Sequence, residues 1–514
     1  MTASDLLLPD RMTLRGAGEA LAGALDVKDG AQREHELSYY DTFDGLLHAA
    51  GLSLIHEDEC LSLVGRETGA IRASLPTGRP EEPLFAVDLA PGPLREALQS
   101  LTDVRALLLL VRLHASERLM SVLDGERKTV VRLALEELAL AGPTGLGSTL
   151  RPRVRITPVR GYDEERRGVQ ATLEQELGFK PAGEPLVDEA VRVIGGVPGG
   201  IPAKIDVPLR FEQRADGGAA AVLRALLEVI EANLAGTIDD LDSEFLHDLR
   251  VSVRRSRAVQ RELRRVFPPG ELVRFRGEFR WLQQASGDAR DLDVHVLEFE
   301  AIRGLVPEEM RGDLDPLLDV LRVRRGQAHR ELGRALRSGR ATALVSGWRS
   351  FLAGLEGAGE ADRPDAARPI GAVAGERIRK VYRQMVRMGR AIEPSSPADD
   401  YHELRKKGKE LRYMLELFGA PLYPGEVVKP MVRTLKGLQD VLGRHQDREV
   451  QLALLRSLGP EVGETAGGQA ALMGMGALIA RLSEDEHAAR SDFAGRFAEF
   501  AAKEQRRLVK ETFG

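Results

Sequence analysis

Residues 247–261 read HDLRVSVRRSRAVQR, and a related segment, HELRKKGKELR, begins 155 residues later at His402. The first segment contains five arginines and no lysine. At the constant offset of 155 the two segments match at five positions, four of them identical and one conserved in charge, which pair His247 with His402, Leu249 with Leu404, Arg250 with Arg405, Arg254 with Lys409, and Arg257 with Arg412. A repeat of this kind indicates an internal duplication in which each copy forms the same structural unit.

The similarity extends on both sides of these segments. Upstream, Arg224 corresponds to Arg379 at the same offset. Downstream, RWLQQASGDARDLDV (280–294) corresponds to KGLQDVLGRHQDREV (436–450) at an offset of 156. From about Gly217 the chain is rich in Ala, Leu, Arg and Glu with a period near 3.6 residues, which is typical of helices. Because the polar segment 354–369 divides this region, we expect one helical bundle in residues 216–355 and a second in residues 369–514.

Helical geometry places the basic residues of the first segment on one side of the helix. At about 100° per residue, His247, Arg250, Arg254, Arg257 and Arg261 fall within a stripe about 80° wide. Like charges at this spacing destabilise an isolated helix by about 0.2–0.5 kcal/mol per pair, and a bound anion would neutralise them. A solvated helix face is the alternative for a single stripe. Its recurrence in both copies favours an anion site, with phosphate as the leading ligand.

The histidine that begins each stripe has two interpretations. A protonated His247 or His402 could donate to a phosphate oxygen, and a nearby polyanion would raise its pKa. Alternatively, each histidine could cap its helix by bonding the backbone at the helix start. The sequence favours neither interpretation over the other.

The first 210 or so residues have a different pattern, one of mixed α and β structure. Apolar alternation on both sides of Asp124-Gly125 predicts a β-hairpin. LFAVDL (84–89) and RVRITPVR (153–160) predict further strands, and residues 163–179 have helical spacing. Glycine and proline cluster in residues 194–208, which indicates a loop or a domain edge.

The composition is that of a multidomain globular protein. The chain has 514 residues, of which 43% are apolar and 30% charged, and its formal net charge of −6 shows no overall bias toward nucleic acid or acidic membranes. Cys60 is the only cysteine, which excludes an intrachain disulfide and a thiolate-rich zinc site. Because no segment resembles a signal peptide or a transmembrane helix, we expect a soluble cytoplasmic protein.

The His-x-Leu-Arg start, the basic stripe and a downstream G-x-x-[RQ]-D element each occur twice, and together they resemble the CHAD family, the conserved histidine α-helical domain. The resemblance covers residues 216–514. It implies two tandem four-helix bundles related by pseudo-twofold symmetry, with a basic surface that binds inorganic polyphosphate. The polyphosphate-binding residues it implies are His247, Arg250, Arg254, Arg255, Arg257, Arg261, Arg379, Lys380, Arg383, His402, Arg405, Lys406, Lys409, Arg412, Lys436 and Arg444. Glu410 stands where the first copy has Arg255, so we do not expect equal contributions from the two copies.

Residues 1–215 resemble a degenerate CYTH domain, a β-barrel tunnel that binds or hydrolyses triphosphates and often precedes a CHAD domain. SYYDTFDGLLHAAGLSL (38–54) is similar to the tyrosine-rich segment of that family. The opening Glu-x-Glu-x-Lys motif of the family is missing, because LLLPDRMTLRG stands in that region and Glu34 and Glu36 are followed by Leu37 and Ser38. The expected fold class is therefore α+β, with a mostly antiparallel, β-barrel-like domain followed by an all-α domain.

We expect from this resemblance a binding protein for inorganic polyphosphate, associated with polyphosphate granules and without catalytic residues, metal or cofactor. The alternative is a metal-dependent triphosphatase or phosphotransferase that acts through the N-terminal domain. Its candidate ligands, Glu136, Glu137, Glu174 and Glu176, are better explained as surface acids. Nucleic-acid binding is least expected, because aromatic residues make up only 5% of the chain and no Phe or Tyr interrupts the first stripe. The sequence leaves the oligomeric state open.

Overall fold

The chain forms two compact units, Met1–Ala203 and Lys204–Gly514, in a computed structural model that describes residues 4–142, 145–357, 359 and 361–513. The division lies some residues before the boundary at 215/216 that the sequence predicts. The reason is packing: Ile205, Val207 and Leu209 are partly buried against the core of the second unit. Each unit is described by itself.

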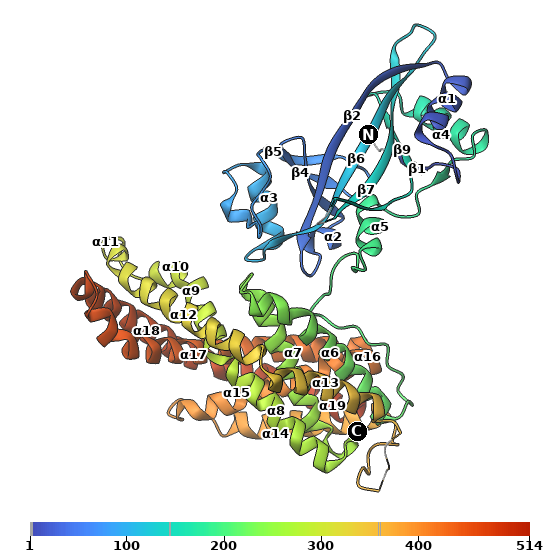
Figure 1. Cartoon of the computed structure of the whole chain (residues 1–514). Helices are drawn as coiled ribbons and strands as arrows, with labels where there is room; N and C mark the ends of the chain where they lie inside the picture. The colour runs from blue at the N-terminus through green and yellow to red at the C-terminus, as the bar shows by residue number, and fades with distance from the viewer. Residues whose placement is uncertain (1–3, 143–144, 358, 360, 514) are drawn as a thin grey trace. The chain divides into compact units, whose positions relative to one another are not determined.

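The first unit is built on one antiparallel sheet, with strands paired in the order β10-β1-β9-β7-β6-β2-β3-β4-β5 and β8 on β7 (Figure 1). The strands are β1 (Ser4–Leu7), β2 (Val27–Thr42), β3 (Leu52–Glu57), β4 (Cys60–Gly65), β5 (Ile71–Pro76), β6 (Leu107–Leu123), β7 (Thr129–Gly142), β8 (Gly145–Thr149), β9 (Arg153–Pro158) and β10 (Lys180–Pro181). The helices are α1 (Leu14–Ala24), α2 (Leu46–Ala49), α3 (Pro93–Thr102), α4 (Asp163–Gln175) and α5 (Leu186–Val193).

Most of the predicted elements of this unit are confirmed. The hairpin at Asp124-Gly125 joins β6 to β7, the segment 153–160 contains β9, and the segment 163–179 contains α4. The strand predicted at residues 84–89 is wrong: Ala86–Asp88 is a single turn of 3-10 helix, and only Leu84 bridges the sheet, at Leu107. This apolar run is buried with Leu94 and Leu98 of α3 rather than paired along a strand.

The second unit is entirely helical and shows the duplication directly. The first copy comprises α6 (Ala215–Ile238), α7 (Ser243–Glu262), α8 (Pro269–Ala285), α9 (Gly287–Leu297), α10 (Phe299–Arg303), α11 (Glu308–Arg311), α12 (Asp315–Leu336) and α13 (Gly339–Gly354). The second comprises α14 (Ile370–Arg390), α15 (Ala398–Met414), α16 (Ala420–Leu422), α17 (Gly425–Gly463), α18 (Gly468–Phe500) and α19 (Lys503–Thr512). In the second copy α17 replaces α8 and α9, which are separated by Ser286 in the first.

The two copies share one hydrophobic core. Helix α6 contacts α14, and α7 contacts α15. The equivalent residues Leu249 and Leu404 are both fully buried in this core, as are Leu223 and Ile378 on the preceding helices. Burying both copies in a single cluster fixes the orientation of α7 relative to α15.

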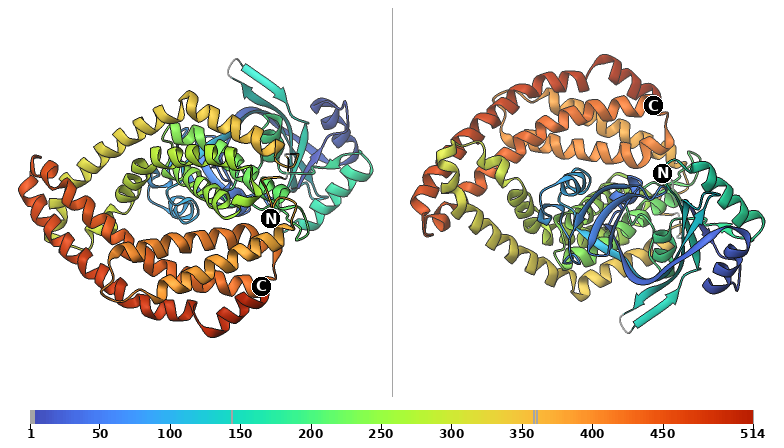
Figure 2. Two further views of the ribbon diagram at one scale, coloured as in Figure 1. Left: turned by 90° about the horizontal axis from the view of Figure 1, so that it is seen from below. Right: turned by 90° about the horizontal axis from the view of Figure 1, so that it is seen from above.

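A second, smaller core joins the far ends of the two copies. There α12 and the segment around Leu314 pack against α17 and α18 (Figure 2). Leu458, Leu478 and Leu482 are among the buried residues of this core. The copies therefore meet at two places, and the hairpins α9–α12 and α17–α18 span the distance between them.

Candidate anion-binding cavity

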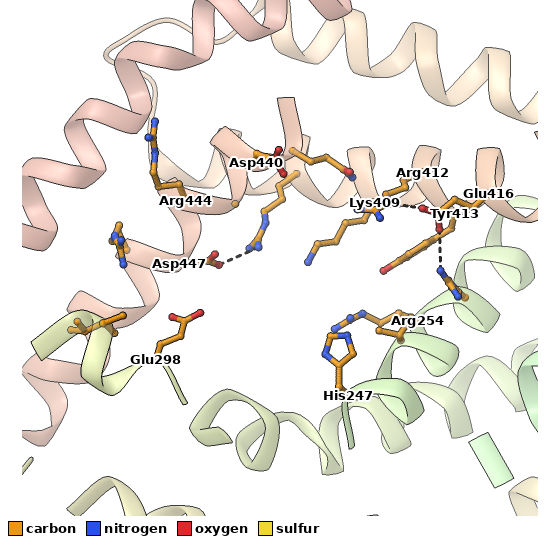
Figure 3. A pocket seen from close by; sticks show the side chains of 18 of the residues that line it. His247, Arg254, Glu298, Lys409, Arg412, Tyr413, Glu416, Asp440, Arg444 and Asp447 are labelled. Atoms are coloured by element: carbon orange, nitrogen blue, oxygen red, sulfur yellow. Dashed lines mark hydrogen bonds and ion pairs between the residues drawn. The ribbon is translucent and has the colours of Figure 1, made fainter. Parts of the chain in front are cut away.

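A cavity of about 880 Å³ lies between the two copies (Figure 3). Its polar lining consists of His247, Arg254 and Arg255 from α7, Arg405, Lys409, Arg412 and Tyr413 from α15, Glu416 from the turn after α15, Gln439, Asp440, Arg444, Asp447 and Arg448 from α17, and Glu298 before α10. Seven Lys and Arg residues thus face four acids. Val251, Ile302 and Leu305 supply apolar lining, and Ile302 also packs against the core at the far ends of the copies.

Helix α7 presents its basic side to this cavity because its apolar side is committed to the core. The helix begins after Asp242, whose carboxylate accepts hydrogen bonds from the backbone of Glu244 and Phe245. Leu249 and Val253 are fully buried, which leaves the adjoining face to His247 and Arg254. Helix α15 of the second copy likewise buries its apolar side in the core and presents basic residues to the cavity.

Arg254 and Lys409, which occupy equivalent positions in the two copies, both line the cavity (Figure 3). Neither side chain makes a hydrogen bond or ion pair with another residue in the described part of the chain. Burial, assisted by the nearby charges of Arg405 and Arg254, lowers the pKa of Lys409 to about 8. Two unneutralised cations brought together from two copies form a site that an anion would stabilise.

Arg250 and Arg405 are also equivalent, yet only Arg405 belongs to the lining. Arg250 is buried, and its Nη1 donates to the carbonyl of Gln283 at 3.0 Å and to Ser286 Oγ at 2.9 Å. Burial lowers the pKa of Arg250 to about 10. Arg405 instead donates to Asp447 Oδ1 at 3.1 Å, so Arg250 anchors the junction of α8 and α9 while Arg405 stays at the cavity surface.

The two histidines contact equivalent residues on the following helix. Nδ1 of His247 lies 2.7 Å from Nη2 of Arg290, and Nδ1 of His402 contacts Oε1 of Gln446. Because a guanidinium only donates, Nδ1 of His247 accepts, and the ring proton of a neutral imidazole is then on Nε2. Asp242, not His247, caps α7, and of the two histidines only His247 lines the cavity.

Glu416 holds two arginines at the edge of the cavity. Its carboxylate accepts from Arg255 at 3.1 Å and from Arg412 at 2.6 Å, and these arginines come from different copies. The guanidinium of Arg255 also lies 6.0 Å from the centre of the Tyr413 ring. The arginines at this edge are therefore already oriented, and part of their charge is neutralised.

Comparison with known families agrees with this architecture. The profile of the CHAD domain family matches residues 221–456, from α6 into α17. The chain contains a CHAD domain. Among solved structures, the CHAD domain from the plant Ricinus communis is 22% identical, covers 57% of this chain and 96% of its own, and has a TM-score of 0.49. PptA from Streptomyces chartreusis is 20% identical, covers 55% of this chain and 99% of its own, and has a TM-score of 0.41. No curated protein matches.

Several residues that the sequence predicts as ligands lie outside the lining of this CHAD cavity. They are Arg250, Arg257, Arg261, Arg379, Lys380, Arg383, His402, Lys406 and Lys436. Arg257 bonds Gln283 beside Arg261 and Arg276, Lys406 is paired with Glu403, and Lys436 is exposed on α17. The basic stripe on α7 is too wide for all of its residues to face the cavity.

Arg448 is a cavity residue of the CHAD domain that the sequence comparison missed. The equivalent position in the first copy is Leu292, so a search for residues shared by both copies could not find it. Its position four residues after Arg444 was the available signal, since both then lie on one side of α17. Both arginines are also paired away from the cavity, Arg444 with Asp492 and Arg448 with Asp485 at 2.8 Å.

In the described part of the CHAD domain, side chains of types that can bind a metal lie together at His445, Glu449 and Glu486. Nε2 of His445 lies 2.8 Å from Glu486 Oε1, and its Nδ1 lies 3.8 Å from Glu449 Oε2. Arg490 donates to the same Glu486 oxygen at 2.5 Å. The guanidinium already supplies the positive charge there, and the arrangement is that of a buried ion-pair network.

The first unit has a cavity of its own, of about 1180 Å³, on the face of β2 that carries Arg33, Leu37 and Tyr39. By strand alternation Glu34 and Glu36 lie on the opposite face. Arg33 is held by Glu57 at 3.0 Å and by Asp58 at 2.7 Å, and it also contacts Glu117. No helix in the described part of the chain is both long and apolar enough to cross a membrane.

Proposed function

We propose that this protein binds inorganic polyphosphate, without hydrolysing it, in the cavity between the two copies of its CHAD domain. The observation that carries the proposal is the pair Arg254 and Lys409. Both cations are unpaired, they come from equivalent positions, and their repulsion contributes to the lowered pKa of Lys409. A polyanion would remove this repulsion and displace condensed counterions as it binds.

A chain of phosphates suits the cavity better than a nucleic acid. Phosphate oxygens match the planar guanidinium groups of Arg254 and Arg405 and the point charge of Lys409. Tyr413 is the only Phe, Tyr or Trp side chain in the described lining, so the cavity lacks the series of aromatic side chains on which successive bases of a single-stranded nucleic acid stack.

Hydrolysis by the first unit is disfavoured by the charges in its cavity. Arg33 is neutralised by acids, as described above, and Arg155 lies 3.4 Å from both Asp5 and Glu136. A triphosphate would have to displace these acids before it could bind the arginines. We therefore propose that residues 1–203 do not form a triphosphatase, and that their resemblance to a CYTH domain concerns the fold.

The test is a titration of the full chain with polyphosphate at several salt concentrations. We expect the logarithm of the association constant to fall linearly with the logarithm of salt, and R254E/K409E to weaken binding at least tenfold. R330E/R334E is the control for an equal change of charge, because Arg330 and Arg334 are both exposed on α12, about one helical turn apart, and neither lines the cavity. Equal losses in both variants would contradict a specific site.

Two further measurements test whether the protein hydrolyses phosphate chains and whether it associates with polyphosphate granules. With tripolyphosphate and magnesium or manganese, we expect no release of phosphate above the uncatalysed rate. In cells that accumulate polyphosphate, we expect the wild-type protein to associate with the granules and R254E/K409E to remain dispersed. Phosphate release that is abolished by R33A would overturn the non-enzymatic proposal.

A further inference from the structure

A second basic site lies in a groove between α14 and α19. The groove has a volume of about 580 Å³ and contains six cations, Arg379, Arg383, Arg387, Arg390, Arg506 and Lys510, around Tyr382, Val386 and Val509. None of its described lining residues is acidic. It shares no residue with the cavity between the two copies.

The cations of this groove form two facing rows. Arg379, Arg383, Arg387 and Arg390 follow one side of α14 at intervals of three or four residues, which spans about 16 Å. Arg506 and Lys510 are one turn apart on α19. Tyr382 also lines the groove.

These six side chains are not neutralised by the protein. Within the described residues none of them makes an ion pair or side-chain hydrogen bond, and Nε of Arg506 is buried without a partner. By contrast, the neighbouring Arg377 is paired with Glu262 at 2.8 Å and Arg368 with Glu376. A buried donor without an acceptor costs free energy that a bound anion would recover.

The first copy keeps the charge of Arg379, as Arg224, but shows that the fold does not need the other three arginines of α14. At the offset of 155, Arg383, Arg387 and Arg390 correspond to Glu228, Ala232 and Ala235 of α6. Helix α13, which packs on α6, carries Arg340 and Arg349, but each of these is paired with an acid, Arg340 with Glu278 and Arg349 with Glu231 of α6. Helix α6 thus packs in the first copy without the row of unpaired arginines that α14 carries in the second, so these charges require an explanation other than stability.

We propose that the groove between α14 and α19 is a second, independent phosphate-binding site, which takes a segment of a condensed phosphate chain. Five of the six cations are arginines, whose guanidinium groups bind phosphate oxygens in a bidentate manner. Bases would find no stacking partner, because the ring of Tyr382 is buried and its hydroxyl donates to the carbonyl of Phe500 at 2.9 Å. Only the choice of polyphosphate as the polyanion rests on the proposed function.

The test is a calorimetric titration of the full chain with tripolyphosphate, compared with R383E/R387A/R390A. This variant installs the residues that the first copy carries at the equivalent positions of α6, and all three arginines are exposed, so we expect it to fold. The wild type should bind two tripolyphosphates per chain. The groove variant should bind one, R254E/K409E should bind one, and their combination should bind none, while R330E/R334E should retain both.

The outcomes separate the two proposals. A groove variant that still binds two tripolyphosphates overturns the second site, and so does a loss that R330E/R334E reproduces. If R254E/K409E keeps both sites while the groove variant loses one, the proposed function of the cavity fails and the groove stands. If single-stranded RNA or polyglutamate of equal charge competes at the groove more strongly than polyphosphate, the assignment to a phosphate chain is wrong.

Discussion

Arg255 and Glu416 form an ion pair across the two copies of the repeat, at 3.1 Å, and Arg261 and Glu410 form a second one at 2.9 Å. At the offset of 155, Arg255 corresponds to Glu410 and Arg261 to Glu416. Both ion pairs therefore join the same two positions of the repeat. In each pair the first copy supplies the arginine and the second copy supplies the glutamate. If both copies carried the same charges, both contacts would join like charges, and the reversal in the second copy removes that repulsion.

This relationship predicts that reversing one charge destabilises the CHAD domain. R255E would place two carboxylates together at a site where the Arg255 and Glu416 side chains are only 16% and 25% exposed. We expect a loss of about 1–3 kcal/mol in the free energy of unfolding, measured by urea denaturation, and partial recovery in R255E/E416R. Recovery is partial because Arg412 also bonds Glu416. A double variant whose loss equals the sum of the single losses would show that the pair is not coupled.

The salt dependence of polyphosphate binding should report the number of cations engaged. Replacing Arg254 and Lys409 by glutamine removes two charges without adding acids. For R254Q/K409Q we expect the slope of log K against log salt to become less steep by about 1.4, from about 0.7 per charge on a single-stranded polyanion. An unchanged slope with weaker binding would mean that these residues support the cavity but do not contact phosphate.

Lys409 makes binding dependent on pH. Its pKa is near 8 in the free protein, so it carries a charge below pH 8 and loses it above. A bound polyanion raises the pKa of Lys409, so polyphosphate binding takes up protons around pH 8, and the affinity falls by up to about fivefold between pH 8 and 9. Titrations across this range provide the measurement. K409R should show a nearly flat profile, because arginine stays charged; a wild-type profile as flat as that of K409R would contradict the prediction.

The equivalent histidines should differ in their effect. His247 lines the cavity, whereas His402 lies outside the lining. We expect H247A to weaken polyphosphate binding about threefold to tenfold, in line with the loss of one hydrogen bond, and H402A to leave the affinity unchanged. H247Q, which retains a donor, should lie between H247A and the wild type. Equal effects of H247A and H402A would indicate a purely structural role for both.

The sequence predicted the fold class well because helical and strand periodicities are local signals. The duplication was readable from His247 and His402 together with a constant offset. The strand predicted at residues 84–89 was wrong because a short apolar run has no period long enough to separate a strand from a turn, and its burial against α3 decided the outcome.

The two basic helices and their equivalence can be read from the residues alone, since helical spacing places His247, Arg254 and Arg257 on one stripe and the repeat supplies its counterpart. The sequence could not determine which side of that stripe faces the other copy, because the orientation of α7 follows from burying Leu249 and Leu404 in one shared core. Tertiary packing therefore put Arg254 and Lys409 into one cavity and Arg250 behind its wall. It also placed Arg379 and Arg383 in a separate groove with α19, a contact between segments more than a hundred residues apart that no local pattern encodes.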